Sequence, residues 1–240
     1  MADPTFNRYA NADRAFDRGY FDEGLRQHML RVFNYMGAGL VLTGLVAFMV
    51  STSPALMQTI FMTPLKWVVM LAPLAFVMVL SFGINRLSFA SAQAIFWAYC
   101  AAMGLSLSAI FLVFTGASIA LTFFVTSATF LAMSLYGYTT KTDLTKMGSF
   151  LMMGVFGIII AGLANLFFQS SALQFAISVL GVVIFTGLTA YDTQAIKEQY
   201  AEGYDRESQG KLALMGALTL YLDFINLFQF LLQFLGQRDE

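Results

Sequence analysis

The chain contains seven apolar stretches long enough to cross a lipid bilayer, and this feature constrains the fold most strongly. Each approaches the roughly 20 residues that a hydrocarbon core of about 30 Å requires. Because lipid offers the backbone no hydrogen-bond partners, continuous stretches of this length form α-helices. The sequence therefore predicts an all-α, polytopic membrane protein with a seven-helix bundle. The expected spans cover residues 32–50, 67–84, 92–114, 119–136, 148–168, 173–191 (continuing as helix toward 196) and 212–235.

The composition agrees with this fold class and excludes several functions. Hydrophobic residues make up 58% of the 240 positions and charged residues only 11%, against about 25% charged in soluble domains. A net charge of −1 predicts no nucleic-acid partner. The single cysteine, Cys100, lies in an apolar run and is expected to be a small buried residue without redox chemistry. No nucleotide loop, zinc-ligand spacing or Ser–His–Asp order is visible, so we expect neither enzymatic activity nor a required cofactor.

The chain divides into a charged tail, a membrane domain and a short end. Residues 1–30 carry mixed charge and lack the apolar core of a signal peptide, so we expect a cytoplasmic tail that is partly amphipathic. The lone histidine, His28, is expected at its surface. Residues 31–236 form the seven-helix domain, and residues 237–240, QRDE, form a short tail.

Basic residues recur in every second connection, starting with the segment before the first span, which holds five arginines. The positive-inside rule therefore predicts a cytoplasmic N-terminus. Seven crossings then place the C-terminal tail outside. Arg238 in that tail conflicts mildly with the rule, which leaves room for a last helix that does not cross fully.

The last span carries one carboxylate, Asp223, near the middle of GALTLYLDFINLFQFLLQFLG. An aspartate at the centre of a membrane helix costs about 2.5–3.5 kcal/mol on insertion scales. The carboxyl group therefore needs a partner, a proton, an ion or water. One interpretation is a structural hydrogen bond to a neighbouring helix. However, Thr219 and Asn226 lie four and three residues away on the same helix face, and this polar stripe exceeds what a structural aspartate needs.

A second acidic residue, Asp192, lies at the end of the sixth span in GLTAYDTQAIK. Counted from the nearest basic residues at 1.5 Å per residue, Asp192 lies roughly 7–8 Å deep and Asp223 roughly 18 Å deep. A sixth helix that extends past Lys197, or a seventh that starts late, would close this gap. The alternative is that Asp192 ends its helix in cytoplasmic water.

Two carboxyl groups buried side by side have a distinctive chemistry. Burial and the neighbouring charge both oppose a second ionisation, so we expect the pair to hold one proton near neutral pH. The shared proton would lock two helices together, and its loss would leave two repelling charges or a possible Ca²⁺ site built from Asp192 and Asp223. Arg86, where the second span meets the cytoplasm, could hold one carboxylate ionised. Its alternative role is a positive anchor.

The segments LTLYLDFINLF, residues 218–228, and AYDTQAIK, residues 190–197, resemble the last and sixth helices of the Bax inhibitor-1 family, also called the transmembrane Bax inhibitor motif family. The resemblance covers nearly the whole chain after the tail. It implies a central last helix surrounded by the other six, and a pH-sensitive leak of cations, chiefly Ca²⁺. The paired aspartates of the family fall on Asp192 and Asp223. Its partner arginine falls on Arg86, where the surrounding NRLSF differs.

Three functions remain open on this basis. The first is a pH-gated Ca²⁺ leak channel, with the lipid bilayer and calcium ions as its partners. The second is a non-conducting modulator of a larger membrane complex, such as a membrane-bound protease, with the N-terminal tail as the docking element. A proton-coupled transporter is the third, and is weaker because no pair of interrupted helices is visible. Short loops and the lack of a targeting sequence suggest a member from the inner membrane of a bacterium.

Overall fold

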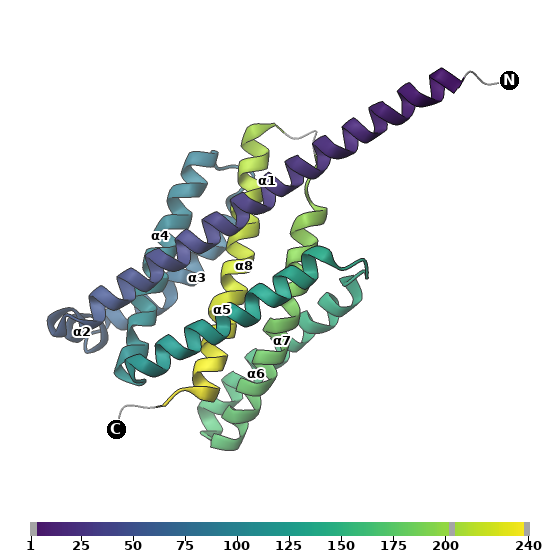
Figure 1. Ribbon diagram of the computed structural model, residues 1–240. Helices are drawn as coiled ribbons and strands as arrows, with labels where there is room; N and C mark the ends of the chain where they lie inside the picture. The colour runs from purple at the N-terminus through teal and green to yellow at the C-terminus, as the bar shows by residue number, and fades with distance from the viewer. Residues whose placement is uncertain (1–3, 202–204, 238–240) are drawn as a thin grey trace.

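The chain folds into a bundle of long helices in a computed structural model (Figure 1). The structure describes the backbone of residues 4–201 and 205–237, and the side chains of residues 23–201 and 205–237. Within these ranges seven helices are long and apolar enough to cross a membrane, which confirms the predicted fold class. The elements are α1 (Pro4–Ser51), α2 (Pro54–Phe61), α3 (Leu65–Gly83), α4 (Phe89–Leu107), η1 (Ser108–Leu112), α5 (Gly116–Thr139), α6 (Thr145–Phe168), α7 (Ser171–Glu198) and α8 (Arg206–Leu235).

Two elements differ from the predicted spans. The third span is α4 followed by one 3₁₀ segment, η1, rather than a single α-helix. The short helix α2 was not predicted. It begins at Pro54, whose fixed φ suits a first helical position, after Ser53, whose hydroxyl accepts a hydrogen bond from the Leu56 amide.

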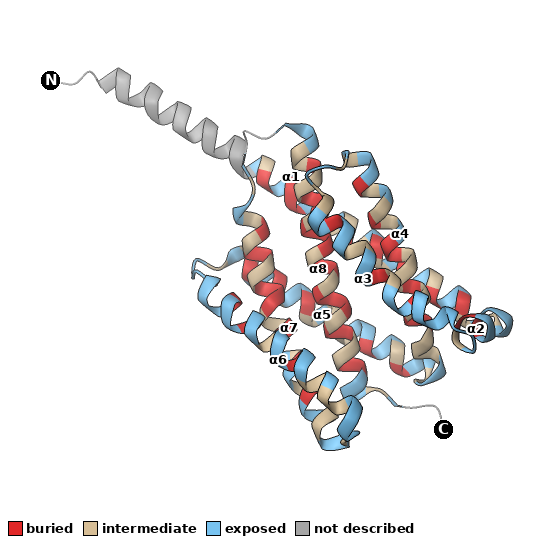
Figure 2. Cartoon of the chain, turned by 180° about the vertical axis from the view of Figure 1, so that it is seen from behind, coloured by how far each residue is buried: buried red, intermediate tan, exposed pale blue. Residues whose placement is uncertain are grey.

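Helix α8 lies at the centre of the bundle. In its most apolar stretch 67% of the residues are buried, against 11% in α6. Figure 2 shows the same contrast between α8 and the exposed outer faces of α6 and α3. Helices α1, α4, α5 and α7 pack directly on α8, whereas α3 packs mainly on α4 and α6 on α7. The last helix is therefore central, as the resemblance implied, but four helices rather than six form its main contacts.

Helix α8 crosses the full thickness of the bundle. Near its start, Gly210 lies against the ring of Phe89, the first residue of α4. Beyond its end, the Gln237 carbonyl accepts a hydrogen bond from the Thr115 amide, and the Gln237 amide donates to the Ser118 hydroxyl. These partners lie beyond the other end of α4. The chain therefore does not end in a half-crossing helix.

Helix α1 joins the packed domain earlier than predicted. Leu25, His28 and Met29 are all buried, so the domain begins before residue 31. Their side chains recur at the three- and four-residue spacing of one helix face. The amphipathic character predicted for the tail falls mostly on side chains outside the described residues.

Candidate functional site

The packing of α8 places Asp223 in the core, where its side chain is only 4% exposed. Its neighbours Tyr221, Phe224 and Leu227 are also buried, so the rotation of α8 about its axis is fixed by packing on several sides. The Asp223 carboxyl group is thereby turned toward α7, where it meets Asp192.

The carboxyl groups of Asp192 and Asp223 lie close enough for a hydrogen bond between the two side chains. Such a bond needs a proton on one of them, because an ionised carboxylate can only accept. Oδ2 of Asp223 is buried and has no hydrogen-bond partner among the described residues, and a proton on one of the two groups would provide one. Sharing one proton satisfies the pair, whereas full ionisation places two negative charges side by side in a region of low dielectric.

Phe224, the residue after Asp223 on α8, packs against α5. The Phe224 ring packs edge-on against Phe130, with 5.5 Å between ring centroids, and against Phe123 at 5.6 Å. On α7, the hydroxyls of Thr189 and Thr193 donate to carbonyls of their own helix. The protons of these hydroxyls are therefore not available for hydrogen bonds to the carboxyl groups of Asp192 and Asp223.

The structure brings together two of the five predicted site residues. Thr219 donates to the Met215 carbonyl at 3.2 Å, and Asn226 donates to the Leu222 carbonyl at 2.8 Å. Both bonds lie within α8, so these two donors bind carbonyls of their own helix and not the carboxyl groups of the aspartate pair.

Arg86 lies away from the pair in the turn between α3 and α4, where it is exposed. Its guanidinium has no hydrogen bond or ion pair within residues 23–201 and 205–237. This placement favours the alternative role as a positive anchor. An exposed arginine at a helix end keeps its charged guanidinium hydrated. A position beside the buried Asp223 would exclude that water.

In this conformation the aspartate pair supplies only the two predicted Ca²⁺ ligands, Asp192 and Asp223. Among the residues whose side chains the structure describes, no cluster of three or more His, Cys, Asp or Glu side chains is suited to a metal ion. Ca²⁺ takes six to eight oxygen ligands. Asp192 and Asp223 would therefore need carbonyl and water oxygens to complete its coordination.

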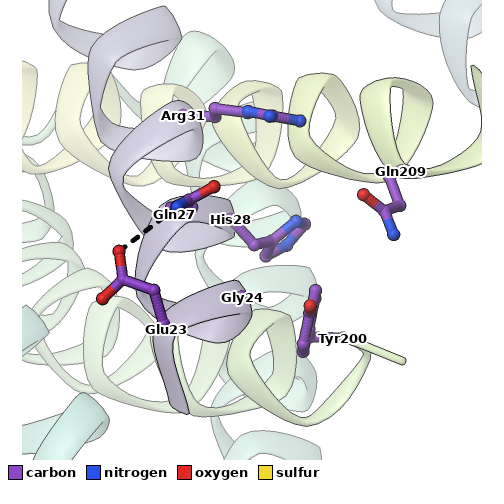
Figure 3. Close-up of a pocket in the computed structure, with 7 residues that line it drawn as sticks. All are labelled: Glu23, Gly24, Gln27, His28, Arg31, Tyr200 and Gln209. Carbon is purple, nitrogen blue, oxygen red and sulfur yellow. Dashed lines mark hydrogen bonds between the residues drawn. The ribbon is translucent and has the colours of Figure 1, made fainter. Parts of the chain in front are cut away.

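A polar pocket that the sequence interpretation missed lies where α1 meets the end of α7 and the start of α8 (Figure 3). His28 points into it and stacks at a tilt on Tyr200, with 5.5 Å between ring centroids. The prediction of a surface histidine was wrong, because His28 is only 5% exposed. Gly24 permits this contact, since a Cβ there would fall 2.1 Å from the Tyr200 hydroxyl. The apolar periodicity around His28 was the signal that could have located it.

The comparisons with known proteins agree with the resemblance seen in the helices of the aspartate pair. The sequence model of the family described as "Inhibitor of apoptosis-promoting Bax1" matches residues 25–240. The chain belongs to this family. The match includes Arg86, Asp192 and Asp223, and begins where α1 enters the packed domain.

Relatives within the family are similar over nearly their whole length. An uncharacterized protein of Rickettsia prowazekii is 50% identical over 220 residues, which cover 92% of this chain and 93% of that protein. An uncharacterized protein of Caulobacter vibrioides is 47% identical over 249 aligned positions, covering 98% and 99%. The inner membrane protein YbhL of Escherichia coli is 46% identical over 218 residues, covering 90% and 93%.

Proposed function

We propose that this family member is a pH-sensitive leak for cations, chiefly Ca²⁺, in the inner membrane of a bacterium. The resemblance to the Bax inhibitor-1 family supports the leak, and the printed name of YbhL, a relative 46% identical, supports the membrane. Seven apolar helices that can cross a bilayer supply the scaffold.

The observation that carries the proposal is the contact between the Asp192 and Asp223 carboxyl groups. One shared proton gives a hydrogen bond between α7 and α8. Any pH change that alters the number of protons on the pair therefore alters the force between these helices. When both groups are ionised they repel each other, and their oxygens become ligands for a hard divalent cation.

Proteoliposomes that contain a Ca²⁺ indicator test this mechanism. The wild-type protein should give a Ca²⁺ flux that depends on pH. Asp223→Asn and Asp192→Asn should each remove that dependence, because an asparagine amide can donate to the remaining carboxylate at any pH. Arg86→Gln is the matched control and should keep the pH dependence, since Arg86 is exposed outside the pair. A pH-dependent flux that survives Asp223→Asn would rule out the gate.

The second function, a non-conducting modulator of a membrane complex such as a protease, is favoured by one observation. The family match begins at residue 25, so the charged segment before it is the part of the chain that the family model does not cover. Deletion of residues 1–22 separates the two functions. A modulator should lose its partner in a pull-down from the native membrane, whereas a leak channel should keep its flux in liposomes.

A further inference from the structure

Helices α1 and α5 both pack on α8 but, over the residues that the structure describes, make few or no contacts with each other. The space between them contains two cavities, which we call together the α1–α5 cleft. The first, of about 410 Å³, lies between residues 26–33 of α1 and residues 131–138 of α5. The second, of about 370 Å³, lies between residues 40–48 of α1 and residues 116–124 of α5, with Phe224, Ile225 and Phe228 of α8 as its floor.

The cleft runs along the membrane-spanning direction. From residue 26 to residue 48 α1 rises roughly 33 Å at 1.5 Å per residue, which matches a hydrocarbon core of about 30 Å. Gly37 comes between the two lining segments of α1 in the sequence, and a Cβ added there would meet no atom within 4 Å. Both cavities are lined almost entirely by apolar side chains, including Leu30 and Leu135, which are 47% and 63% exposed.

Positive charge is concentrated at one end of the cleft. Arg26 lines the first cavity, and its ion pair with Glu23, at 3.3 Å, is exposed and therefore weak. Lys197 reaches Tyr138, another lining residue, by donating to its carbonyl at 2.8 Å while lying 5.3 Å from its ring centroid. Lys197 has no carboxylate partner among the residues whose side chains the structure describes. An anionic group at this end would therefore meet Arg26 in the lining of the cavity, and Lys197 would add positive charge from beside Tyr138.

We propose that the α1–α5 cleft binds an anionic phospholipid from the leaflet at the Arg26 end, with its phosphate at Arg26 and Lys197 and an acyl chain along the cavities. Ser134 also lines the first cavity, about 6 Å of helix rise before Tyr138, but its hydroxyl is buried below the lining surface.

The size of the cleft favours an acyl chain over a protein helix. A helix about 10 Å across and 33 Å long occupies roughly 2,600 Å³, several times the volume of the two cavities. A helix from a second copy or from another protein would rest on the rim and leave the cavities unfilled. A flexible hydrocarbon chain can follow them, and the bilayer supplies it.

Native mass spectrometry tests the proposal on the full-length protein in mild detergent, with equal amounts of phosphatidylglycerol and phosphatidylcholine of the same chain length. The wild-type protein should retain one phosphatidylglycerol in preference to phosphatidylcholine. Arg26→Gln should reduce that preference about fivefold, the effect of one basic group near an anionic surface. Lys146→Gln, an exposed lysine at the same end of the bundle on α6, is the matched control and should leave it unchanged.

The double variant Leu30→Trp/Leu135→Trp fills the first cavity from both walls and should abolish retention of the lipid. Leu163→Trp/Leu166→Trp introduces the same side chains at exposed positions of α6 and should keep it. A thermal melt of each variant shows whether the fold is intact. Equal retention of both lipids by the wild-type protein would overturn the proposal, as would a dimer that the cavity-filling variant dissociates. Flux assays are not needed, so the proposal stands or falls separately from the leak function.

Discussion

The hydroxyl of Thr43 on α1 lies 2.6 Å from the hydroxyl of Tyr221 on α8, and both residues are buried. Thr43 also donates its single hydroxyl proton to the Cys100 carbonyl of α4, at 2.8 Å. Tyr221 must therefore be the donor to Thr43. This chain of two hydrogen bonds joins three helices two residues away from Asp223.

Thr43→Val keeps the shape of the side chain and removes both hydrogen bonds. The expected loss in the free energy of unfolding is about 0.6–1.7 kcal/mol, from the average to the largest value found for a hydrogen bond between membrane helices. Titration with SDS in mixed micelles measures it. The control is Thr59→Val, because the Thr59 hydroxyl donates only within its own helix and is exposed. An equal loss in the two variants would contradict the role assigned to Thr43.

Gly137 sets the distance between α5 and α7 near the carboxyl pair. A Cβ at Gly137 would fall 2.1 Å from the Ala190 carbonyl oxygen, a backbone atom that cannot rotate away. Gly137→Ala should therefore push the helices apart and cost about 1–3 kcal/mol, as overpacking does. Gly157→Ala on α6 is the control, since its Cβ would meet nothing within 4 Å. Thermal melts of both variants in detergent measure the difference, and similar melting temperatures would show that α5 and α7 can adjust.

Asp205 caps the N-terminus of α8 outside the membrane-spanning segment. Its carboxylate accepts hydrogen bonds from the amides of Glu207 and Ser208. Its hydrogen bonds with Ser208 hold the pKa of Asp205 below its usual value. The cap therefore stabilises the helix start above the unfolded-state pKa, and this contribution is lost as the pH falls through the lower folded-state pKa.

For this cap, Asp205→Ala should speed amide hydrogen exchange at Glu207 and Ser208 severalfold at neutral pH, because their acceptor is gone. The difference from the wild-type protein should shrink once the pH is low enough to protonate the wild-type carboxylate. Asp205→Asn keeps a neutral acceptor, so its exchange protection should not change over that range. Exchange rates in the alanine variant equal to the wild-type rates at neutral pH would show that the cap is not needed.

The seven spans could be predicted from the sequence because the thickness of the bilayer sets their length and the lack of water sets their hydrogen bonding. The two carboxyl groups were harder to place. Their estimated depths differed because Lys197 was taken to mark the membrane boundary. In the structure Lys197 turns back to the Tyr138 carbonyl, and α7 continues to Glu198. A basic residue inside a packed bundle is thus a poor marker of depth.

The positions of Arg86 and His28 could not be predicted from their neighbours in the sequence. His28 is covered by Tyr200 of the segment after α7, which is distant in the sequence. Arg86 instead stays exposed in the turn between α3 and α4, and α3 packs mainly on α4 rather than on α7 or α8. The interpretation of His28 relied on the charges around it and overlooked the buried spacing of Leu25, Met29 and Val32. A single polar residue on an otherwise apolar helix face is buried together with that face.

Gln194, two residues after Asp192, fastens α7 to the link between α5 and α6. Its side-chain carbonyl accepts from the Leu144 amide at 2.8 Å, and its amide donates to the Thr142 carbonyl at 2.9 Å. The side chain is only 6% exposed. A neutral group that both donates and accepts is therefore required at this position.

Gln194→Glu should convert this fastening into a pH-dependent one. A protonated carboxyl group can still accept from Leu144 and donate to Thr142, whereas an ionised carboxylate can only accept and would face the Thr142 carbonyl. The variant should approach wild-type stability at low pH and lose about 1–3 kcal/mol at high pH, because a buried acceptor is left unpaired beside a buried charge. Unfolding by SDS across a range of pH measures it. Gln194→Leu should instead be destabilised equally at every pH, and wild-type stability of both variants at high pH would show that neither bond holds the end of α7.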